Sequence, residues 1–150
     1  MGLLSTNGGV SSLILRLTLG VVMFAHGSQK VLGWFGGQTF FETLNMFTQK
    51  MHMPAPLAIL IMAAEFLGGL GLIVGLLTRI AAFGVACDMI GAIALVHWKF
   101  GLFMNWFGTQ KGEGFEYHLL AIAICIALII RGAGVLSLDR LLSAGSPPAA

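Results

Sequence analysis

Four long apolar stretches, each carrying at least one ionisable side chain, constrain the fold of this 150-residue chain more than any other feature. A hydrocarbon layer ~30 Å thick needs ~20 mostly apolar residues in a helix, so each stretch is a candidate transmembrane helix. The fourth is the shortest, because its uncharged run is limited to residues 117–130. The pattern predicts an all-α, polytopic membrane protein whose four-transmembrane-helix bundle spans about residues 11–32, 57–77, 80–98 and 116–131.

The composition agrees with a protein that is partly covered by lipid. Apolar residues make up 57% of the chain and charged residues 9%, against roughly 25% charged residues in soluble domains. A chain of this length is about one domain, so we expect a single membrane domain over residues 1–150. The net charge of +2 supplies no basic field of the kind that binds nucleic acid.

Ionisable side chains inside the predicted spans are the most informative residues of the sequence. A charge near the middle of a bilayer costs several kcal/mol, so such groups face the interior of a bundle and find partners there. At a rise of about 1.5 Å per residue, three of them are expected at similar depths near the middle: Arg16, Glu65 and Asp88. We expect Arg16 to meet the two carboxylates, which makes the three candidate catalytic groups for proton transfer. The alternative is an Arg16–Glu65 pair that only fixes the register of two helices.

A second set of polar side chains gathers at one rim of the predicted bundle: His26, Lys30, His97, Glu116 and His118. Hydrogen-bond donors in an apolar cleft suit the carbonyl oxygens of a quinone, with the deeper carboxylates as proton acceptors. The five are therefore candidate cofactor-binding residues, the alternative being that water solvates them. His26 with His97 or His118 could instead ligate a haem, which the sequence favours less than quinone. His97 follows Asp88 by nine residues and is expected on the opposite helix face. No residue set predicts a metal site.

The segments that join the predicted spans carry their own patterns. Thr39-x-x-Glu42 is a capping-box pattern, and residues 40–51 after it predict an amphipathic helix lying in the membrane interface. Residues 99–115 are rich in aromatic side chains, which is typical of the same interface. Four spans place both termini on one side of the membrane. Arg79 and Arg131 on that side favour cytoplasmic termini, although Lys and Arg divide equally between the two sides.

Two further patterns have structural interpretations. The glycine-rich stretch Gly68–Gly75 lacks the strand–turn–helix context of a nucleotide-binding fingerprint, and Gly71-x3-Gly75 within it is typical of close helix packing. Cys87 and Cys125 fall in different predicted spans without a Cys-x-x-Cys motif. They are expected to behave as small apolar residues.

Five short motifs, in order from about residue 13 to residue 142, resemble the pattern of the DoxX family. Asp88 is not part of that pattern. The motifs are Arg16-x3-Gly20 leading to His26-Gly27-x2-Lys30; Glu65-x2-Gly68-Gly69-x-Gly71-x3-Gly75 continuing to Arg79; His97-Trp98; Gly114-Phe115-Glu116-Tyr117; and Gly132-x-Gly134-x2-Ser137-Leu138-Asp139.

The resemblance implies a small four-helix inner-membrane protein of bacteria or archaea, linked to respiratory redox systems and named an oxidoreductase. We therefore expect a subunit or accessory factor of a redox complex, in contact with lipid and with other membrane or soluble redox subunits, and self-association is compatible with so small a core. Two alternatives stay open. The first is a non-catalytic scaffold that recruits soluble oxidoreductases. The second is a small proton-coupled transporter, which the carboxylates inside the spans would serve.

Overall fold

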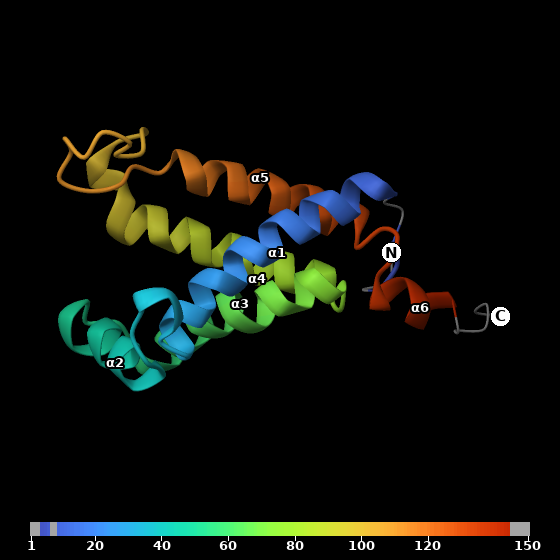
Figure 1. The fold of residues 1–150 in the computed structure, drawn as a ribbon, viewed down its shortest axis with the longest axis horizontal. Coiled ribbons are helices and arrows are strands. Elements are labelled where there is room, and N and C mark those ends of the chain that lie inside the picture. The colour runs from blue at the N-terminus through green and yellow to red at the C-terminus, as the bar shows by residue number, and fades with distance from the viewer. Residues whose placement is uncertain (1–3, 7–8, 145–150) are drawn as a thin grey trace.

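A computed structural model describes residues 4–6 and 9–144 of the chain, and within them the regular structure is helical, without strands. Four long helices form the body of the molecule (Figure 1). Three helical segments are long and apolar enough to cross a membrane, namely Val10–Val31, Ala55–Val74 and Thr78–Phe100. The four long helices are α1 (Val10–Val31), α3 (Ala55–Val74), α4 (Thr78–Ala92) and α5 (Glu116–Arg131).

These helices occupy the ranges in which the sequence predicts spans, and local signals fix their ends. Pro54 caps the start of α3 and Pro56 lies in its first turn, where the missing N–H of proline has no helical partner to lose. Gly75 ends α3 with a left-handed φ of 69°, a conformation that glycine adopts without strain. The Gly71-x3-Gly75 pattern thus ends a helix and also packs closely: a Cβ at Gly75 would lie 2.5 Å from Cβ of Ser137, and one at Gly71 would lie 3.7 Å from Cβ of Ala81 on the next helix.

The closest approach between two helix backbones involves two other glycines, where α1 crosses α3. A Cβ at Gly27 would lie 2.4 Å from the backbone nitrogen of Phe66, and a Cβ at Gly69 would lie 2.4 Å from that of Phe24. No larger residue fits at such distances. Because two backbones touch here, α1 and α3 lock together in one register along their length, and this register decides which polar side chains meet.

Between α1 and α3 the chain forms short helical turns: η1 (Trp34–Gly36), α2 (Phe40–Asn45) and the π-helical turn η2 (Met46–Lys50). The predicted capping box is confirmed, because Glu42 Oε2 accepts hydrogen bonds from the backbone nitrogen and Oγ1 of Thr39, both at 2.8 Å. These bonds to the charged form lower the pKa of the exposed Glu42 carboxyl. A second π-helical turn, η3 (Ile93–His97), and a 3-10 turn, η4 (Trp98–Phe100), extend α4.

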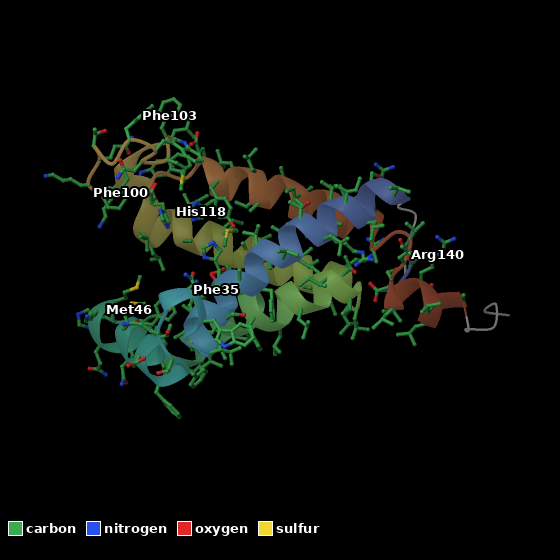
Figure 2. The ribbon with its side chains drawn as sticks, in the orientation of Figure 1. Phe35, Met46, Phe100, Phe103, His118 and Arg140 are labelled. Atoms are coloured by element: carbon green, nitrogen blue, oxygen red, sulfur yellow. The ribbon has the colours of Figure 1, made fainter. Side chains whose placement is uncertain are left out.

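The start of α1, the turn between α3 and α4 and the short α6 (Leu138–Ala144) share one end of the molecule, and α2 and the loop 101–115 share the other (Figure 1). In Figure 2, Phe100 and Phe103 accordingly lie far from Arg140. The main core lies among the four long helices, whereas large apolar side chains on their outer faces, such as Leu60, Phe83 and Leu120, stay exposed. An apolar exterior of this kind suits a lipid environment.

Candidate functional site

One ion pair joins α1 to α3 within the helix bundle. Lys30 Nζ lies 2.5 Å from both carboxylate oxygens of Glu65. The Glu65 side chain is 7% exposed and the Lys30 side chain 27%, so the carboxylate is buried while the ammonium retains contact with the surroundings. A buried carboxylate needs such a partner, because removing its charge from water is costly.

Arg16 does not take the place that the sequence analysis gives it. It is 1% exposed, and its guanidinium donates to the carbonyls of Leu72 and Ile73 at the end of α3, at 3.0 and 2.5 Å. It also donates to the carbonyls of Ala133, Val135 and Leu136 in the segment after α5. The last carbonyls of a helix lack partners within the helix, and they form its negative end. Arg16 therefore caps the C-terminal end of α3 and connects it, through hydrogen bonds, to the segment that follows α5.

Arg16 and Glu65 are expected at similar depths, but they do not meet, because α1 and α3 are shifted along each other. Gly27 packs against Glu65 and Phe66. Pro56 precedes Glu65 by nine residues, so α3 begins about 14 Å beyond this crossing. Glu65 consequently lies at the level of Lys30, and Arg16 lies at the far end of α3.

Asp88 on α4 lies beside this ion pair. It is 9% exposed, and its Oδ2 has no hydrogen-bond partner among the residues that the structure describes. Its electrostatic neighbours are Glu65 and Lys30. The two carboxylates therefore share one ammonium group, as the sequence analysis expects of its central cluster, although the cation is Lys30 instead of Arg16.

Aromatic and imidazole rings from three helices surround the same region. The ring centres of His97 and His118 lie 4.2 Å apart, and Tyr117 lies 5.4 Å from His118 and 6.4 Å from His26. Tyr117 Oη is buried without a partner among the described residues. His97 Nδ1 donates to the carbonyl oxygen of Glu113 at 2.8 Å.

The placement of His97 corrects the expectation that it lies opposite Asp88. The turn η3, which ends at His97, is π-helical, so its hydrogen bonds run from residue i to residue i+5. Each residue of such a turn rotates through less than the α-helical angle. The accumulated difference turns His97 part of the way towards the face of Asp88, and both residues line one cavity.

A cavity of about 390 Å³ connects these groups. Six of the eight residues that the sequence analysis proposes line it, and Arg16 and Glu116 do not. Its wall contains sulfur and aromatic side chains besides polar ones, a mixture typical of small-molecule sites. The titratable lining residues are His26, Lys30, Glu65, Asp88, His97, Glu113, Tyr117 and His118, and the apolar ones include Met23, Phe47, Met51, Met53, Met89 and Met104.

Glu116 serves the neighbouring loop. Its Oε1 accepts hydrogen bonds from the backbone nitrogen of Met104 and from Nε1 of Trp106, both at 3.0 Å. Glu113 similarly accepts from the backbone nitrogen of Asn105 at 2.7 Å. These bonds fix the aromatic loop 101–115 over the cavity.

Two residues have roles in the structure that the sequence patterns did not predict. Tyr117 lines the cavity. It ends the Gly-Phe-Glu-Tyr motif and directly precedes His118, and this position was the signal in the sequence that could have identified it. Asp139 accepts hydrogen bonds from the backbone nitrogens of Leu77 and Thr78, at 2.7 and 2.9 Å, and so caps the start of α4 from a distant part of the chain. Its position in the last motif marked it, but no local pattern revealed the partner.

Both cysteines are free. Cys87 is exposed and Cys125 buried, and neither forms a disulfide. Within residues 4–6 and 9–144, no three His, Cys, Asp or Glu side chains are grouped so as to hold a metal ion.

Comparisons with known proteins agree with this architecture. "Putative oxidoreductase CatD" of Bacillus subtilis (strain 168) is 33% identical over 130 residues, which cover 87% of this chain and 85% of that protein. "Inner membrane protein YqjF" of Escherichia coli (strain K12) is 28% identical over 134 residues, 89% of this chain and 93% of that protein. No solved structure gives a significant match. Residues 11–98 match the DoxX family, and the chain, a membrane protein with several apolar helices, belongs to that family.

Proposed function

We propose that this protein is an inner-membrane subunit or accessory protein of a respiratory or redox complex, and that it binds the head group of a quinone in the cavity between its helices. The observation that carries the proposal is the cavity itself, in which an ammonium, three carboxylates, imidazoles and a phenol face one space inside an apolar bundle. Such groups are costly inside a membrane protein and usually mark a functional site.

The chemistry of the lining suits a quinone. A quinone head is a flat apolar ring with carbonyl acceptors at opposite ends, and Lys30, Tyr117 and the imidazoles supply donors around a cavity rich in methionine. Reduction of a quinone consumes protons together with electrons. Glu65 and Asp88 share one ammonium, which leaves a negative charge that a proton can neutralise, so they can take up or release the protons. The electrons would come from a partner redox protein.

The same proposal includes the membrane arrangement. We place α5 (Glu116–Arg131) as a fourth span, because it packs along α4 and α1 and returns the chain to the end where α1 begins. At 16 residues it is ~24 Å long, so its ends reach the interface with Arg131 at one side. We place α2 and η2 in the opposite interface, beside exposed aromatic side chains such as Phe41 and Phe107. The basic residues near the other end favour cytoplasmic termini.

Extraction of bound quinone tests the function. The protein is purified from native membranes in mild detergent, extracted with organic solvent and analysed for quinone, and the same preparation is titrated with added quinone. We expect bound quinone in the wild-type protein, and its loss in the Lys30→Met/Glu65→Gln double variant, which removes the polar pair without leaving an orphaned charge. Lys111→Met, at an exposed lysine outside the cavity, is the matched control.

A wild-type protein that neither carries nor binds quinone would refute the proposal. Capture of soluble oxidoreductases by a protein without quinone would support a scaffold instead. Proton-coupled solute flux in proteoliposomes that Asp88→Asn abolishes would support a transporter.

A further inference from the structure

A second hollow lies on the outer, lipid-facing side of the bundle, between α3 and α4. It has a volume of about 500 Å³ and an almost wholly apolar lining. Along α3 it runs from Leu57 to Gly68, a length of ~16 Å at the rise of an α-helix. Small residues open the space between the two helices: Ala63, Ala64, Gly68, Ala81, Gly84 and Gly91.

This outer groove meets the polar cavity. Four residues line both hollows: Ile61, Asp88, Gly91 and Leu95. At Gly91 an added Cβ would have no neighbour within 4 Å, so the junction is open at that point. Asp88 faces the same junction with one carboxylate oxygen that lacks a partner among the described residues, although the residue is only 9% exposed. An unpartnered buried carboxylate at the neck of an apolar groove is costly unless a ligand group meets it.

We infer that the groove between α3 and α4 is the entry route and the tail-binding site of a ligand with a neutral, hydrogen-bonding head and one long hydrocarbon tail, a prenylated quinone or quinol. This inference rests on the proposed function and adds to it the entry route of the ligand and the binding site of its tail. The head passes from the lipid phase between the helices into the polar cavity. The tail stays in the groove, and a quinol hydroxyl at the junction donates to Asp88 Oδ2.

The charges of the cavity argue for this class of ligand over a phospholipid. Two carboxyl groups, Glu65 and Asp88, lie beside the single ammonium of Lys30, which is already paired with Glu65. A phosphate head group would therefore find no free cation among the described residues at the junction, whereas a neutral ring with hydroxyl or carbonyl groups needs none. A water-soluble ligand, in turn, would gain nothing from an apolar groove that opens towards lipid.

A plug in the groove tests the tail site. Gly84 lines the groove and not the polar cavity, and a Cβ there would meet only Ala64 Cβ, at 3.6 Å. Gly84→Phe therefore fills the groove and leaves the head site unchanged. Ile90→Phe is the matched control, because Ile90 is exposed on the same helix and lines neither hollow. Binding to the purified protein in nanodiscs is measured for two probes: a dimethoxy-methyl-benzoquinone, and the same ring with a decyl chain.

We expect Gly84→Phe to weaken binding of the decyl probe about tenfold or more, the usual effect of forcing extra atoms into a filled space, and to leave binding of the tail-less ring unchanged. Ile90→Phe should change neither. Equal weakening of both probes, or no change in either, would overturn the tail site while leaving a quinone site in place. If the wild-type protein binds neither probe, the proposed function fails and the inference fails with it.

Discussion

Replacing Lys30 with methionine leaves the Glu65 carboxylate buried without its partner. Breaking a buried ion pair by removing one member costs about 3–5 kcal/mol. Because the Lys30 side chain is 27% exposed, the pair is partly screened, and we expect the lower end, about 3 kcal/mol. For a chain of this length each kcal/mol shifts the melting temperature by about 2–4 °C. Lys30→Met should therefore lower it by about 6–12 °C.

Glu65→Gln should cost less, about 1 kcal/mol, because the Lys30 ammonium can turn towards the more exposed side. The double variant Lys30→Met/Glu65→Gln should be more stable than Lys30→Met alone, since the orphaned carboxylate is gone. The two residues touch, so their effects should be non-additive by about 1–3 kcal/mol.

The assay is thermal unfolding in one detergent, followed by circular dichroism, for the wild type, both single variants and the double variant. Lys111→Met controls for the loss of a lysine charge and should stay within about 0.5 kcal/mol of the wild type. Additive effects of the two single changes, or a double variant less stable than Lys30→Met, would refute the pairing of Lys30 with Glu65.

Three further predictions follow from other contacts. Arg16→Leu should destabilise the protein by several kcal/mol because it leaves buried carbonyls unpaired, and adding Glu65→Leu should not restore the melting temperature; restoration would show that the two residues are partners after all. Asp139→Asn should cost about 1–2 kcal/mol in the same melts by weakening the cap of α4, and an unchanged melting temperature would contradict the cap. Glu42 has a pKa below its usual 4.5, so its stabilisation of α2 is complete above that pH and is lost as pH falls through the lowered value. Hydrogen exchange of α2 amides should therefore accelerate on acidification in the wild type and be pH-independent, apart from the intrinsic rate, in Glu42→Gln.

Much of the fold follows from local sequence signals. Apolar runs of sufficient length specify helices that lipid can cover, and Pro54, Gly75 and the Thr39–Glu42 pair mark helix ends through contacts within a few residues. The inward orientation of Glu65 and Asp88 also follows from the sequence, because the cost of exposing ionisable groups to hydrocarbon applies whatever the tertiary arrangement.

The sequence determined which side chains must be buried, and only the tertiary structure decided which of them meet. Contacts between helices depend on how far one helix is shifted along its neighbour, and that shift is set by the backbone contact of Gly27 with Glu65 and Phe66 and by the folded segment before α3. Because of a shift of about 14 Å, Glu65 pairs with Lys30, and Arg16 donates to the carbonyls at the end of α3. No local pattern encodes such a distance, because it results from packing between residues far apart in the chain.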